Sequence, residues 1–137
     1  MSTEAISTAF EVALAAMPGA LPFAKEGVAF PNPKKAPYAE IQLDMSAPQG
    51  LVVGGDFVRE VGSFKVTFCF PTGSGLTEGR AKVDQIKRRF KHGTNLDANG
   101  IRVHVRQPPY TGPVLPDAVW QRFPVRVPFF ADVYGAV

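Results

Sequence analysis

The chain has 137 residues, of which 45% are hydrophobic and 20% charged, and its formal net charge is +3. This length fits a single domain, spanning residues 1–137, that is long enough to bury a core, and the composition excludes a disordered chain. The single cysteine excludes an internal disulfide, and no stretch approaches the roughly 20 apolar residues that a membrane-spanning helix needs. We therefore expect no membrane association.

The first elements in chain order are a helix and two strands. Apolar residues recur at helical spacing from Thr3 to Met17, and Pro18 and Gly19 end this helix. A short edge strand is expected at Gly27–Phe30, where the prolines that follow limit its length. Residues Tyr38–Ser46 alternate between apolar and polar side chains, which predicts a half-buried strand. The polar residues on its outer face are Glu40, Gln42 and Asp44.

A glycine-rich connection and a long strand follow. Residues Phe57–Phe70 alternate again, with Phe64 and Phe68 on the inner face and Lys65 and Cys69 on the outer face. Together with Tyr38–Ser46 this strand predicts a long hairpin. Its loop, at about residues 46–57, is expected to project from the domain and contains two candidate contact residues, Gly54 and Asp56.

The second half of the chain predicts a basic helix and two more strands. The helix is expected at Thr77–His92, the strands at Ile101–Arg106 and Val119–Phe129, and "TNLDANG" is interpreted as a turn. Val119 is placed on the inner face. The residues predicted to point outward are Arg102, His104, Arg106, Trp120, Arg122 and Arg126.

These elements predict an α+β fold. An antiparallel four- to five-stranded sheet would carry the N-terminal helix and the central amphipathic helix packed on one face. The strands keep one polar face, which favours antiparallel pairing over a doubly wound parallel sheet.

No catalytic or cofactor-binding pattern emerges from the sequence. The segment "FCFPTGSGLTEGRAK" has the outline of a phosphate-binding loop, but its glycine spacing does not fit, and Arg80 and Ala81 replace the required lysine and hydroxyl residue. One cysteine and two scattered histidines offer no metal-ligand spacing, and no base is positioned to activate Cys69. We expect no enzyme activity, no cofactor and no metal.

The predicted helix at Thr77–His92 carries six Lys or Arg and two acidic residues, so it is locally +4 while the rest of the chain sums to −1. Two interpretations stay open. The cations could contact nucleic-acid phosphates, or they could form a solvated face that complements the C-terminal end of the helix dipole. The second interpretation is favoured by charge pattern alone. The candidate partner-facing or DNA-facing residues are Lys87, Arg88, Arg89 and Lys91.

The outer sheet face separates acidic residues on one strand from basic residues on others. Such residues could neutralise one another across strands. Alternatively, opposite patches of neighbouring copies could meet head to tail and close a ring. Tyr110 and Trp120, beside a proline-rich segment, are aromatic side chains of the kind that interfaces use.

Several phrases resemble one family of small phage proteins. They are "KAPYAEIQLDMS", "GSFKVTFCFPTGSG", a helix ending "RRFKHGT", "GIRVHVRQPPYTGPVLPD" and "WQRFPVRVPF". In order and spacing they resemble the tail terminator (tail completion, minor tail) proteins of long-tailed phages, prophages and gene transfer agents.

The resemblance implies a structural virion protein, assembled in the host cytoplasm, that caps the head-proximal end of the tail tube as a homo-oligomeric, typically hexameric, ring. Such a ring ends tube polymerisation and provides the surface for head–tail joining. Its implied partners are other copies of itself, the tail tube protein and a head–tail connector or stopper, with non-specific contact to DNA in the lumen. A nucleic-acid-binding module or another neck or connector protein is the alternative. The interface candidates are Glu40, Gln42, Asp44, Gly54, Asp56, Arg102, Arg106, Tyr110, Trp120, Arg122 and Arg126.

Overall fold

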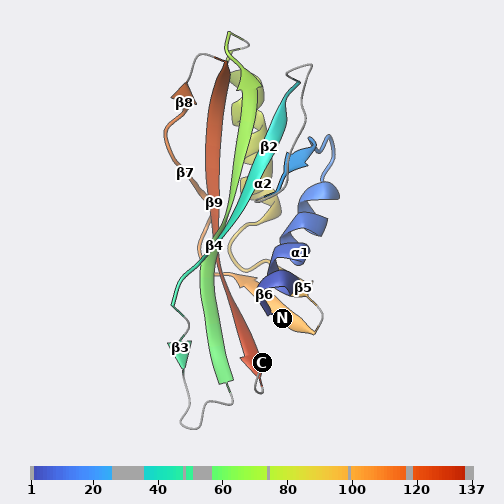
Figure 1. Cartoon of the computed structure of the whole chain (residues 1–137), viewed down its shortest axis with the longest axis vertical. Helices are drawn as coiled ribbons and strands as arrows, with labels where there is room; N and C mark the ends of the chain where they lie inside the picture. Colours follow the sequence, from blue (N-terminus) through green and yellow to red (C-terminus); the bar gives the residue numbers. More distant parts are fainter. Residues whose placement is uncertain are drawn as a thin grey trace.

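The computed structural model describes residues 2–25, 36–47, 49–50, 57–73, 75–98, 100–116 and 119–134. Over these residues, the two helices and the longer strands follow the hydrophobic periodicity of the sequence (Figure 1). The helices are α1 (Ser2–Ala15) and α2 (Thr77–Arg89). The strands are β1 (Phe23–Ala24), β2 (Tyr38–Met45), β3 (Gln49–Gly50), β4 (Phe57–Pro71), β5 (Asn95–Ala98), β6 (Ile101–Val105), β7 (Tyr110–Thr111), β8 (Leu115–Pro116) and β9 (Trp120–Tyr134).

These strands form one nine-stranded sheet. Its main order is β1-β2-β4-β9-β6-β5, with β3 added to β4 and with β7 and β8 added to β9. The pairs are antiparallel except for β1 with β2, which is parallel. The sheet is therefore mixed, although one short parallel pair is the whole departure from antiparallel order among the described strands.

The centre of the sheet is a ladder between its two longest strands. β4 and β9 have 15 residues each and pair along their whole length, from Phe57 opposite Tyr134 to Pro71 opposite Trp120. β2 pairs only with the second half of β4, from Met45 opposite Gly62 to Tyr38 opposite Cys69. As a result β4 and β9 continue together beyond β2 and both helices (Figure 1).

Both helices pack on the inner face of the sheet. The Phe10 ring of α1 stacks on the Phe64 ring of β4, with centroids 4.5 Å apart. It also lies 5.2 Å from the ring of Phe129 on β9 and 5.7 Å from the ring of Phe90, the residue that follows α2. All four side chains are buried. Aromatic rings bury large areas and prefer such offset or tilted contacts, so this cluster joins both helices to the sheet.

Gly79 of α2 packs directly against Phe123 of β9. A Cβ atom at this position would fall under 3.0 Å from the ring of Phe123. The ring is itself buried and held edge-on against Phe70, with centroids 6.0 Å apart. Glycine therefore permits a helix–sheet contact that any other residue would push apart.

The α+β class and the packing of both helices on one face are confirmed, but the prediction of a four- to five-stranded antiparallel sheet was wrong. Four of the additional strands have only two residues, too short for any periodicity to show. Asn95–Ala98, interpreted as part of a turn, forms β5 against β6. The predicted edge strand at Gly27–Phe30 lies outside the described residues.

Boundaries also differ from the predicted ones. α2 ends at Arg89 rather than at His92, and β9 runs to Tyr134 rather than to Phe129. Val119, predicted to point into the core, precedes β9 and is 40% exposed. Most of the predicted projecting loop at residues 46–57 lies outside the described residues, but two of its members form β3 on β4.

Candidate functional site

The outer face of β2, β4 and β9 is polar, and two of its arginines are paired with carboxylates within the chain. Arg126 of β9 reaches across β4 to Asp44 of β2, with Nη1 donating to Oδ2 at 2.7 Å and to the Ser63 hydroxyl at 3.1 Å. Gln42 donates to the other carboxylate oxygen of Asp44 at 2.8 Å. Asp44 and Arg126 are each about one-third exposed, so the pair is partly shielded from water. This arrangement matches the first sequence interpretation, neutralisation across strands.

A second pair lies nearer the other end of these strands. Arg122 Nε lies 3.4 Å from Glu40 Oε1, and the same oxygen accepts a hydrogen bond from the Cys69 thiol at 3.2 Å. The Trp120 ring meets the Tyr38 ring edge-on at 5.1 Å. Trp120 does lie on the outer face, as predicted, but it is half-buried against Tyr38 rather than fully presented to a partner.

Cys69 is expected to be inert in the folded chain. Burial, together with the hydrogen bond and the negative charge of Glu40, raises the pKa of its thiol from 9.0 to about 12. At pH 8 the thiolate population, and with it the alkylation rate, should fall by about three orders of magnitude relative to an ordinary thiol. Iodoacetamide labelling followed by mass spectrometry measures this rate.

The matched control is the same chain in 8 M urea, in which labelling should be rapid and complete.

The raised pKa of the Cys69 thiol also makes the stability of the fold depend on pH. Above about pH 9 the unfolded chain loses the thiol proton while the folded chain keeps it, so the free energy of unfolding falls as the pH rises from about 9 to about 12. The pKa of Tyr38, raised to about 12 mainly by burial, contributes in the same direction. Rapid labelling of the native chain at pH 8 would contradict the burial of this thiol.

The extended part of β4 and β9 carries a third pair, which the sequence did not single out. Arg59 binds Asp132 with two hydrogen bonds, of 2.7 and 3.1 Å. The Arg59 guanidinium also lies 4.3 Å from the centroid of the Phe130 ring, and His104 stacks on the same ring at 4.7 Å. The sequence does contain a signal for this pair. The inward and outward alternation of β9 continues past Phe129 through Ala131 and Val133, which places Asp132 on the outer face.

The remaining outer-face candidates are distributed rather than clustered. Arg102 is exposed and pairs with Asp97 of β5 at 3.4 Å, and Arg106 is exposed just after β6. The Tyr110 side chain is 52% exposed on β7, opposite Arg126 in register. Gly54 and Asp56 lie outside the described residues.

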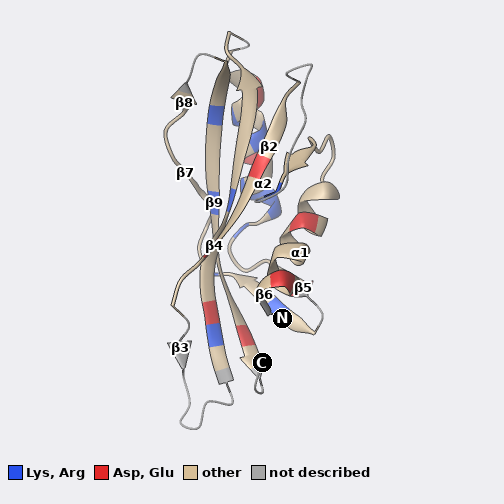
Figure 2. Ribbon diagram, viewed as in Figure 1, with Lys and Arg blue, Asp and Glu red and all other residues tan. Residues whose placement is uncertain are grey.

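The basic residues gather on and just after α2 (Figure 2). Lys87, Arg88 and Arg89 occupy its last turn, where cations complement the helix dipole. Lys91 lies after the end of the helix instead of within it. Arg89 lies 5.2 Å from the centroid of the Phe90 ring. These side chains are exposed, and within the described part of the chain no ion pair includes Lys87, Arg88 or Lys91.

The described residues provide several polar and charged surfaces. Among them no group of three or more His, Cys, Asp or Glu side chains could hold a metal ion. Over the same residues no helix has both the length and the apolar character needed to cross a membrane. One side of the sheet carries the paired arginines Arg122 and Arg126, and α2 carries exposed cations on the other.

Comparison with known proteins agrees with this geometry. The family model described as phage tail terminator protein matches residues 5–129. One solved structure shares 24% sequence identity with this chain, covers 99% of both chains and superposes with a TM-score of 0.80, which shows that the fold is shared. No curated protein matches significantly. With a family match over nearly its whole length, the chain belongs to the phage tail terminator proteins, a family of structural proteins of the phage tail.

Proposed function

We propose that this protein caps the head-proximal end of a phage tail tube as a homo-oligomeric, hexameric ring, ends polymerisation of the tube and provides the surface that joins the head. The observation that carries the proposal is the family match over residues 5–129. The protein would assemble in the host cytoplasm and remain in the tail of the virion, with the tail tube protein and a connector or stopper as partners.

The ion pairs on the polar face bear on which residues would make contacts between subunits of the ring. Arg122 and Arg126 are already paired with Glu40 and Asp44 inside the chain, which leaves less free charge for a head-to-tail contact through these residues. Arg106 and Tyr110 are exposed, and neither side chain forms an ion pair or ring contact within the described residues. We therefore propose that Arg106 and Tyr110 contribute more to contacts between subunits, or to the tube, than the paired arginines do.

The test adds the purified protein to polymerising tail tube subunits of the same phage. Electron microscopy of negatively stained samples should show shorter tubes, each with a ring at one end. Arg106→Glu combined with Tyr110→Ala should restore tube growth and remove the rings, because an interface loses both a charge and an aromatic contact.

The matched control changes two exposed residues on the opposite side of the sheet, Glu4→Gln with Val12→Ala on α1, and should cap as well as the original chain. Tubes that grow unhindered, with nothing bound to their ends, would refute the capping role. Equal capping by both double variants would leave that role intact but remove Arg106 and Tyr110 from the interface.

The cations at the end of α2 favour one second candidate function, nucleic-acid binding. Lys87, Arg88 and Lys91 are exposed and lack ion partners among the described residues, so they are available to phosphates. Such binding should weaken steeply with salt and should be lost on Lys87→Glu with Arg88→Glu. If the protein shifts neither DNA nor RNA in a gel at low salt, this candidate is eliminated.

A further inference from the structure

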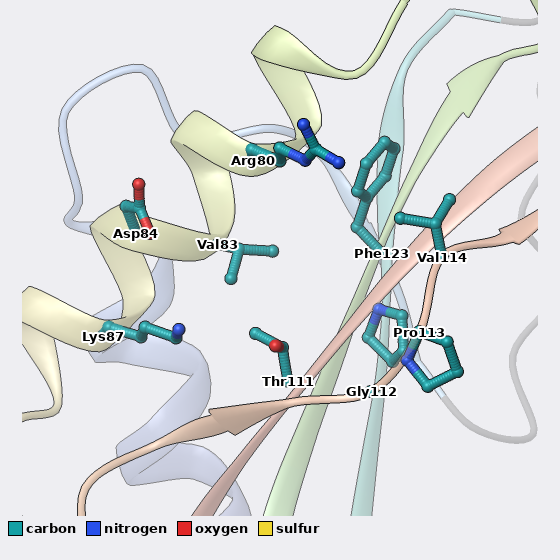
Figure 3. A pocket seen from close by; sticks show the side chains of 10 residues that line it. Arg80, Val83, Asp84, Lys87, Thr111, Gly112, Pro113, Val114 and Phe123 are labelled. Carbon is teal, nitrogen blue, oxygen red and sulfur yellow. The ribbon is translucent and has the colours of Figure 1, made fainter.

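A groove lies between α2 and the β7–β8 segment, and charged side chains of α2 line it. Its volume is about 400 Å³. One wall is the face of α2 that carries Arg80, Val83, Asp84 and Lys87, so it has two cations and one carboxylate (Figure 3). The other wall is the uncharged stretch at 111–114. Phe123 and Pro124 of β9 form its floor. The close approach at Gly79 fixes this floor against the helix.

The two cations of the groove extend from α2 toward the strands, with Val83 between them (Figure 3). Neither Arg80 nor Lys87 forms an ion pair with any described residue. Lys87 lies in the last turn, where the helix dipole favours a cation. Arg80, by contrast, lies in the first turn, where the dipole disfavours one. The dipole therefore does not account for Arg80, although Asp84, four residues on, offsets part of this cost. The guanidinium is left available to a ligand in the groove.

The chemistry of the groove selects its occupant. Arg80 and Lys87 are seven residues apart, so their Cα atoms are separated by about 10 Å along the helix. An extended peptide rises about 3.3 Å per residue and presents every second side chain to one side. A matching segment would have acidic residues at its first and fifth positions and an apolar residue at its third. Its two carboxylates would then lie near the cations, with the apolar side chain between them.

Nucleic acid fits this groove less well. Its phosphates are spaced by the nucleic-acid backbone and would meet cations on one wall only, beside the carboxylate of Asp84. The floor and the other wall would remove water from the phosphates, and the Gly112 N–H there already donates to Pro124 O. We propose that the groove binds a short extended segment of a partner protein in which an apolar side chain is flanked by carboxylates. This inference goes beyond the tail-capping role and does not depend on it.

The experiment titrates the full-length, isotope-labelled chain with the capped peptide Ac-Glu-Ser-Leu-Ser-Glu-NH2 and follows backbone amide resonances by NMR. We expect a Kd of about 0.1–1 mM, with the largest shifts at Val83, Thr111 and Val114. Replacing the peptide leucine by alanine, or both glutamates by glutamine, should each weaken binding by about tenfold or more.

The decisive variants differ only in where two charges are reversed. Arg80→Glu with Lys87→Glu should weaken peptide binding by about tenfold or more. Arg88→Glu with Lys91→Glu makes the same charge change outside the groove and should leave the Kd within about twofold once salt screening is matched. Arg80→Gln with Lys87→Gln, a milder pair, should give an intermediate loss even if the charge reversal disturbs folding.

Three outcomes would overturn the proposal. The first is the absence of any peptide-induced shift at millimolar concentration. The second is an equal loss of binding in both charge-reversal variants, which would indicate a general electrostatic attraction. The third is binding of a short DNA duplex that is lost in the Arg80 and Lys87 variant while the peptide does not bind, which would make the groove a nucleic-acid contact.

Discussion

Replacing Phe10 by alanine is expected to destabilise the protein by about 3–5 kcal/mol, the range for truncating a fully buried phenylalanine. The Phe10 side chain has no exposed area and touches three other buried rings, those of Phe64, Phe90 and Phe129. These rings belong to β4, β9 and the end of α2, so the cavity would open where both helices meet the sheet. Neighbouring rings cannot fill it without losing their own contacts, and partial relaxation is what makes such cavities costly.

Chemical denaturation followed by circular dichroism measures the change in the free energy of unfolding. Val12→Ala is the matched control, because Val12 lies on the same helix but is 63% exposed. Its substitution should change stability by no more than about 0.5 kcal/mol. A loss below about 1 kcal/mol for Phe10→Ala would mean that α1 does not hold the sheet in the way described.

Gly62→Ala is expected to destabilise the protein by about 2–3 kcal/mol, toward the upper end of the range for overpacked positions. A Cβ atom at Gly62 would lie under 3.0 Å from the main-chain oxygen of Asp44, and it would also press on Met45 and on the Phe129 ring at 3.2 Å. Main-chain atoms cannot rotate away as a side chain can. Relief would require β2 to separate from β4, where Ser46 N donates to Val61 O at 2.8 Å.

The matched control is Gly112→Ala, since a Cβ atom there would make only an ordinary contact, 3.4 Å from the Pro124 ring. Its effect on the free energy of unfolding should stay within about 0.5 kcal/mol. Thermal unfolding of the two variants, side by side, checks the difference. Equal stability of Gly62→Ala and the original chain would show that β2 ends less tightly against β4 than the register indicates.

Long, strongly periodic elements could be predicted from the sequence. The inner face of β4, for example, repeats a large apolar side chain at Phe64, Val66, Phe68 and Phe70, and all four are buried. Such a pattern has one physical solution, because a shift of one residue would expose every one of them. The N-terminal helix followed from the same reasoning, and its stripe indeed contains the buried Ile6, Phe10 and Leu14.

The small strands and the pairing across β4 could not be predicted in this way. A two-residue strand such as β7 or β8 exists because β9 offers it main-chain partners, and nothing in "YT" or "LP" encodes this. Likewise, the sequence identified Asp44 and Arg126 as opposite charges on one face, but only the register of β2, β4 and β9 places them 2.7 Å apart. The groove at Arg80 required the same tertiary information, because its walls are about 30 residues apart in the chain.

The uninterrupted ladder of β4 and β9 has a mechanical consequence. Its 15 antiparallel pairs span about 50 Å, and no turn or break divides either strand. When the two strands are pulled apart along their axis, the hydrogen bonds are loaded in shear and many must break together. When the strands are instead peeled apart from one end, the hydrogen bonds break one at a time. These two strands therefore form a rigid connection between the part of the sheet that the helices cover and the part that extends beyond them. A displacement of Tyr134 along the strand axis would therefore move Trp120 as well, with little stretching of the strands between them.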